Sequence, residues 1–107
     1  MASGALAYLQ GGDAEAVIHA AALSLKNMLG LVCDPVAGLV EVPCIKRNSY
    51  GAVNAITSAQ LALAGIRSAI DPDDVIDSMK RIGIQMHGSL KETSQGGLAV
   101  SGSAKKY

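Results

Sequence analysis

The sequence predicts an all-α fold, a compact helical domain fragment of about four to five helices with a long cysteine-bearing loop. Apolar residues recur at spacings of three and four along several segments, as on one face of a helix. These segments begin and end at capping residues and glycines. No alternating pattern typical of a strand is longer than Val40–Val42. At 107 residues, the chain is one domain at most, or a piece of one.

The first two helices are predicted over Ala2–Leu9 and about Ala14–Leu29. Asp13 is a suitable N-cap for the second helix, Glu15 favours its positive end, and Gly30 can follow its last turn. Its apolar face consists of Val17, Ile18, Ala21, Ala22, Leu25, Met28 and Leu29. The first helix has no cap and a thin apolar face. We therefore expect the chain to start inside a longer protein.

The next helix is predicted over Ser49–Ala64 and has two possible buried faces. Its expected core stripe consists of Ala52, Val53, Ile56, Ala59 and Leu63. A second face of small residues consists of Ala55, Ser58 and Ala62. We therefore expect this helix to pack on both sides.

Two more helices are predicted towards the end of the chain. The run from Asp71 to Asp74 combines a cap, a proline at the first position and acidic residues in the first turn, and the helix it opens continues to about His87. Ser89 and Glu92 have the spacing of a capping box, which predicts a short helix over Leu90–Gln95. The last residues are expected to form a polar, frayed tail.

Composition and charge exclude several functional classes. The chain has nine basic and nine acidic residues, no Phe or Trp and three Tyr, so it lacks the basic surface and the aromatic platforms of a nucleic-acid binder. No apolar run is long enough to span a membrane. The N-terminus lacks the charged region of a signal peptide. The prediction is a cytoplasmic protein without a membrane partner.

The segment from Gly30 to Asn48 contains both cysteines, Cys33 and Cys44, and two of the three prolines. It is apolar and has no helical period. Loops this long are uncommon inside a domain and are usually functional. A buried loop must also satisfy its own backbone polar groups, so we expect an anchor. Two thiols binding an inorganic centre are one such anchor.

Ten residues separate the cysteines, and this spacing alone is a weak signal for metal. Nearby prolines stiffen the loop, and the positive charges of Lys46 and Arg47 would offset ligated thiolates, as around iron–sulfur clusters. Two thiolates do not hold a four-iron cluster, so a further ligand is needed. The alternatives are two buried cysteines acting as small hydrophobic residues, or a structural metal or redox site.

Lys46, Arg47 and Asn48 are candidate substrate-binding residues, because such side chains can bind a carboxylate. The alternative is an ordinary polar start to the next helix. Gly96 and Gly97 could bring backbone amides close to a ligand, although they also suit a helix stop.

Four further polar residues are expected to play structural roles. Asn27 and Asn54 lie inside helices that they disfavour, and they are expected to bond to the loop backbone. His19 is expected to be packed or solvent-facing. His87 is expected on the surface near a helix C-terminus.

Several runs of this sequence resemble the alpha portion of iron–sulfur L-serine dehydratases. The matching runs are Leu25–Asn27, GLVCDPVAGLVEVPCIKRN at 30–48, Gly51–Ala52, Asn54–Ala55, Ala62–Gly65, Leu90–Thr93 and Gly96–Ala99. The resemblance extends from about Gly11 to Ala99. It implies that the whole chain, residues 1–107, is the C-terminal part of an all-helical catalytic domain, without its upstream part and the beta domain.

The resemblance also implies a cofactor and a reaction. The family's domain holds a [4Fe-4S] cluster with three cysteine ligands and one iron open to substrate. Cys33 and Cys44 match two of these ligands, and the third lies upstream of this chain. The implied reaction converts L-serine to pyruvate and ammonia. The implied partners are a beta domain or subunit and further copies in a homo- or hetero-oligomer. The isolated 107 residues are expected to be inactive, and the sequence does not identify the catalytic base. The alternative is a non-catalytic helical interaction module.

Overall fold

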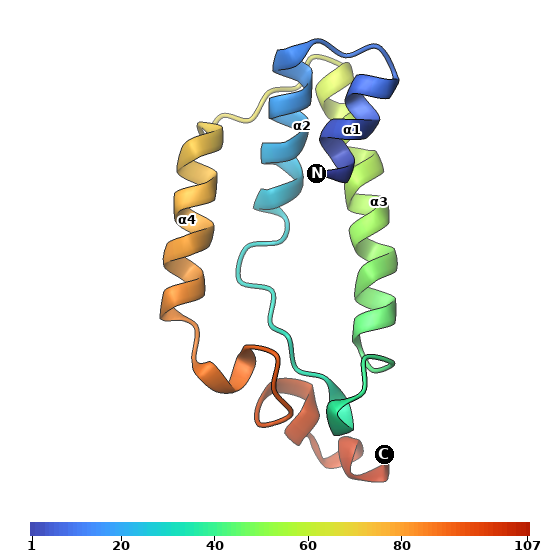
Figure 1. Cartoon of the computed structure of the whole chain (residues 1–107), viewed down its shortest axis with the longest axis vertical. Coiled ribbons are helices and arrows are strands. Elements are labelled where there is room, and N and C mark those ends of the chain that lie inside the picture. Colours follow the sequence, from blue (N-terminus) through green and yellow to red (C-terminus); the bar gives the residue numbers. More distant parts are fainter.

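The computed structural model describes residues 1–107 and confirms the all-α class (Figure 1). The four α-helices are α1 Ala2–Leu9, α2 Ala14–Lys26, α3 Cys44–Leu63 and α4 Pro72–Gln85. The four short 3-10 helices are η1 Val36–Gly38, η2 Gly88–Leu90, η3 Gly97–Val100 and η4 Gly102–Lys106. The molecule measures 48 × 25 × 15 Å, so it is only about one or two helix diameters thick. None of its helices is both long and apolar enough to cross a membrane.

Helices α1, α2 and α3 pack against one another and form the core, while α4 packs on α2 (Figure 1). The core residues are Ala7, Ala20, Ala59 and Ala62. Small side chains allow the helices to approach closely, and the buried Ser3 hydroxyl donates a hydrogen bond to the Ala20 carbonyl at 3.0 Å. In Figure 1 helices α1, α2 and α3 meet at one end of the molecule. The chain after α2 runs away from it towards the C-terminal 3-10 helices.

The buried face of α3 is the small-residue face. Ala55, Ser58, Ala59 and Ala62 are buried, whereas Val53 and Ile56 are more than half exposed. The predicted core stripe is therefore wrong at Ala52, Val53 and Ile56, and Ile18 on α2 is likewise half exposed. Close packing against α1 and α2 selects small residues, and Val53 and Ile56 lie outside that contact.

The predicted caps of α2 and α4 are confirmed. The Asp13 carboxylate accepts the Ala16 N–H at 2.8 Å, and the Asp71 carboxylate accepts the Asp73 N–H at 3.0 Å. Helix α1 has no side-chain cap, as expected.

Two predicted boundaries differ from the structure. Helix α2 ends at Lys26 rather than Leu29, and α3 begins at Cys44 rather than Ser49. The first turns of α3 are polar and lack an apolar period, so the periodicity signal missed them. Cys44 consequently lies on a helix and not in the loop.

The predicted helix over Leu90–Gln95 is wrong. Glu92 has a φ of 60°, which is incompatible with the interior of an α-helix, and the Ser89 N–H donates to the His87 ring at 3.2 Å. Ser89 and Glu92 therefore have the spacing of a capping box but do not form one. The predicted frayed tail is also wrong, because Gly102–Lys106 forms η4.

Candidate metal centre

The two cysteines lie on different elements and come together. Cys33 is in the extended segment after α2, and Cys44 is the first residue of α3. Both are free and partly exposed. The Cys44 side chain lies near enough to the Cys33 thiol to influence its pKa. Partial burial, the neighbouring Cys44 and the Glu92 carboxylate raise the pKa of Cys33 above its usual value. The protein environment alone therefore favours the neutral thiol.

Backbone hydrogen bonds fix Cys33 on both sides. Its N–H donates to the Leu90 carbonyl at 2.9 Å, and its carbonyl accepts the Glu92 N–H at 2.8 Å. The two segments thereby form a single parallel bridge between Cys33 and Lys91. This bridge satisfies backbone polar groups of the loop, whereas the anchor suggested from the sequence was an inorganic centre bound by the two thiols.

Asp34, next to Cys33, was not identified from the sequence. It is 1% exposed, and each of its carboxylate oxygens is bonded. Oδ1 accepts from Arg47 Nη1 at 2.5 Å, and Oδ2 accepts from the Leu98 N–H at 2.6 Å. Burial on its own would raise the pKa of Asp34, but the Leu98 N–H and the Arg47 guanidinium outweigh it and hold that pKa below its usual value. The group is therefore a buried, paired carboxylate.

Arg47 lies one helical turn after Cys44 and is turned into the protein. Its Nη1 also donates to the Val32 carbonyl at 3.0 Å. Lys46 and Asn48, its neighbours on the first turns of α3, are exposed. Lys46 and Asn48 therefore face solvent close to Cys44, whereas Arg47 is bonded to the cysteine loop, which is the segment 27–43 between α2 and α3.

The second candidate segment reaches the loop through Gly97. Gly97 has a φ of 58°, and a Cβ at this position would overlap the Asp34 carboxylate. Gly96 is buried against Ser89. A further link joins Ser94 to the loop: its hydroxyl donates to the Pro35 carbonyl at 2.5 Å and accepts the Gly38 N–H at 2.9 Å. The segment from 88 to 98 is thus a support for the cysteine loop.

Asn27, which follows the last residue of α2, and Asn54, inside α3, do not bond to the loop backbone as predicted. The Asn27 amide donates to Asn54 Oδ1 at 2.7 Å, and the Asn54 amide donates to the Ser24 carbonyl at 3.0 Å. They join α2 to α3. They were recognisable as unusual helix residues, but their partners were not predictable from the sequence.

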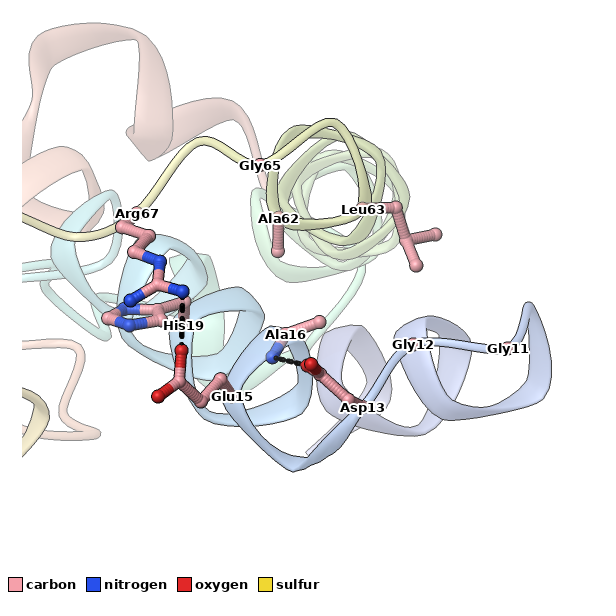
Figure 2. Close-up of a pocket in the computed structure, with 10 residues that line it drawn as sticks. All are labelled: Gly11, Gly12, Asp13, Glu15, Ala16, His19, Ala62, Leu63, Gly65 and Arg67. Atoms are coloured by element: carbon pink, nitrogen blue, oxygen red, sulfur yellow. Dashed lines mark hydrogen bonds and ion pairs between the residues drawn. The ribbon is translucent and has the colours of Figure 1, made fainter.

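The largest pocket lies far from the cysteines. It has a volume of about 350 Å³ and is lined by the α1–α2 turn and the end of α3 (Figure 2). Glu15 and Arg67 form an exposed ion pair across it, and the His19 ring accepts the Ser68 N–H at 3.2 Å. His19, expected to be packed or solvent-facing, is partly exposed and lines this pocket. Helix α3 has 20 residues, so its two ends are roughly 30 Å apart.

The comparisons with known proteins identify the family. The family model described as "Serine dehydratase alpha chain" matches residues 1–99. The chain belongs to the serine dehydratase alpha-chain family. It is 58% identical over 101 residues to a probable L-serine dehydratase alpha chain of Bacillus subtilis, covering 94% of this chain and 34% of that protein.

Two other members of the family show the same pattern of coverage. An L-serine dehydratase alpha chain of Peptoniphilus asaccharolyticus is 48% identical over 106 residues, with 99% of this chain and 36% of that protein covered. L-serine dehydratase 1 of Escherichia coli is 46% identical over 101 residues, with 94% and 22% covered. The chain thus spans about a third of the two alpha chains and less of the Escherichia coli protein. The resemblance stated from the sequence is confirmed at the level of the family.

Proposed function

We propose that this chain is the cysteine-bearing, C-terminal part of the alpha domain of an iron–sulfur L-serine dehydratase, which converts L-serine to pyruvate and ammonia. The observation that carries the proposal is that Arg47, three positions after Cys44 on α3, bonds the residues on either side of Cys33, which brings the two cysteines together from two different elements. Membership of the serine dehydratase alpha-chain family supports the reaction.

The donor set fits a part of a [4Fe-4S] site. Cysteine thiolates are the usual ligands of such clusters, and both thiols here are free and partly exposed. No group of three or more His, Cys, Asp or Glu side chains is placed to hold a metal ion. We therefore propose that Cys33 and Cys44 supply two ligands and that a third cysteine comes from outside these 107 residues.

The proposed roles of the other residues follow from their positions. When bound, the cluster would supply a Lewis-acid iron that assists departure of the serine hydroxyl. Lys46 and Asn48 are exposed beside Cys44 and can bind the serine carboxylate. Arg47 adds positive charge close to the thiolates while it holds the loop. Gly96 and Gly97 can act on the substrate only through their backbone groups, because neither has a side chain.

The proposed partners are L-serine, a beta domain or subunit and further copies of the enzyme, and the proposed compartment is the cytoplasm. The relatives named as alpha chains support a second type of chain. Large apolar side chains such as Tyr50, Val53 and Ile56 are exposed on α3. We expect the isolated chain to associate with itself or with other proteins through such surfaces and to show no turnover.

The test is anaerobic reconstitution of the enzyme that contains this chain, with Cys33→Ala and Cys44→Ala compared with Ser49→Ala. Each cysteine variant is expected to lose the cluster absorbance near about 400 nm and pyruvate formation from serine. Ser49→Ala, an exposed change close to Cys44, is expected to retain both. Full activity in both cysteine variants would refute the proposal.

The exposed apolar surface also supports a second candidate, a non-catalytic helical interaction module. This alternative predicts that both cysteine variants bind the partner chain normally and that the wild-type assembly forms no pyruvate. The same reconstitution therefore distinguishes the two functions.

A further inference from the structure

We propose that Asp34 is the positioning residue of the Cys33–Cys44 pair. Its buried carboxylate would set the relative position of the two thiols and seat the 97–98 segment beside them. The inference rests on the proposed function for its purpose, namely a prearranged pair of cluster ligands. The contacts that place Asp34 between the two cysteines are all made by residues of this chain.

The Asp34 carboxylate joins three segments at one point. Asp34 itself belongs to the cysteine loop, its Oδ1 accepts a hydrogen bond from Arg47 of α3, and its Oδ2 accepts the Leu98 N–H of η3. The missing side chain of Gly97 provides the space for this contact. No other side chain described around the cysteines connects these three elements.

Arg47 extends this link to both cysteines. Its guanidinium bonds the Asp34 carboxylate and the Val32 carbonyl, which are the residues on either side of Cys33. Arg47 also stands three positions after Cys44 on α3, where side chains share a helix face. One guanidinium therefore holds the backbone around Cys33 at a fixed place relative to the helix turn that carries Cys44.

The burial of the pair indicates a function that a surface ion pair would not serve. Asp34 is 1% exposed and Arg47 25% exposed at its side chain. Buried charges carry a desolvation penalty that hydrogen bonds must offset, so burial of this pair points to a fixed geometry as its role. Here the geometry that is fixed is that of the residues next to two thiols.

The test uses phenylarsine oxide, a trivalent arsenical that condenses with two neighbouring thiols. Two As–S bonds form, the As=O bond is lost, and the oxygen leaves as water with the two thiol protons. Affinity for this probe depends on the spacing of the thiols and requires no cluster. Removing a coupled contact of this kind typically changes such an equilibrium by about tenfold, which is the loss expected for Asp34→Ala.

Two matched variants separate positioning from general stability. Asp71→Asn changes an exposed aspartate that accepts one backbone N–H on α4 and is expected to bind the arsenical like the wild type. Asn54→Ala weakens the α2–α3 contact without touching the cysteine loop and is also expected to keep wild-type affinity. Asp34→Asn retains the shape but loses the charge, and it is expected to fall between Asp34→Ala and the wild type.

Each result decides the proposal. A tenfold loss in Asp34→Ala with normal Asn54→Ala supports it, and affinities within about twofold of each other overturn it. If Asp34→Ala does not fold, as judged by helical circular dichroism, Asp34→Asn decides in the same way. Failure of the wild-type enzyme to form a cluster would refute the proposed function while the arsenical affinities still test the role of Asp34.

Discussion

Substituting Gly97 by alanine tests whether the contact between η3 and the cysteine loop stabilises the fold. Gly97 combines two features: a φ of 58°, which disfavours side chains, and a Cβ direction that is blocked by the Asp34 carboxylate. The new methyl group would displace Asp34 and thereby break the 2.6 Å bond from the Leu98 N–H. Both effects lower the free energy of unfolding.

The two contributions can be estimated separately. A non-glycine residue in the left-handed region costs about 1–2 kcal/mol. A hydrogen bond to a charged group contributes about 1.5–3 kcal/mol. We therefore expect Gly97→Ala to lower the free energy of unfolding by about 2.5–5 kcal/mol, which is a large part of the total for a domain of this size. The corresponding loss in Tm is roughly 10 °C or more.

The assay is urea and thermal unfolding followed by circular dichroism, with Gly65→Ala and Gly38→Ala as controls. Both glycines also have positive φ values, 85° and 74°, but no atom lies within 4 Å of a Cβ at either position. Each control is expected to lose only the conformational part, about 1–2 kcal/mol. If Gly97→Ala costs no more than these controls, the contact with Asp34 does not stabilise the protein and the reasoning fails.

Three further predictions concern the helices. Ala59→Leu, at the fully buried contact of the three helices, is expected to lower the free energy of unfolding by about 1–3 kcal/mol through overpacking. Thr57→Leu, on the exposed side of α3, should be nearly neutral in the same urea titration, and equal losses in the two variants would contradict the assigned core. Asn54→Ala is expected to lower the free energy of unfolding by about 1–3 kcal/mol, because it removes both the donor to Ser24 and the acceptor for the Asn27 amide. An unchanged denaturation midpoint would show that this polar contact does not contribute to stability. Asp71→Ala should lower the free energy of unfolding by about 1 kcal/mol, because α4 loses its N-cap. Amide hydrogen exchange should increase only in the first turn of α4, and a uniform increase along the chain would rule out a local effect of the cap.

The helices were largely predictable because their signals are local. Asp13 and Asp71 cap the helices that they were predicted to cap, since an N-cap needs only its own side chain and the next turn. The errors occur where tertiary contacts override local signals. Ser89 has the spacing of a capping box with Glu92, but the His87 ring takes its N–H and the chain turns at Glu92 instead.

The candidate site was only half predictable for a similar reason. Cys33 and Cys44 are recognisable from residue type and from the unusual loop between them. Asp34 is not, because an aspartate before a proline is also an ordinary turn residue. Its role depends on Leu98, 64 positions along the chain, and on a guanidinium that the sequence suggested as a substrate ligand. No local pattern encodes either contact.

The cost of closing the cysteine loop explains why the site needs such contacts. Asp34 and Arg47 are 13 positions apart, and closing a flexible loop of that length costs about 2 kcal/mol of chain entropy beyond a constant term. The Val36 N–H bonds the Val42 carbonyl at 2.9 Å inside the loop, and the buried ion pair closes its base. These contacts offset the entropy during folding. A metal centre bound between Cys33 and Cys44 would then not have to order the loop itself, so its binding free energy would be retained in affinity.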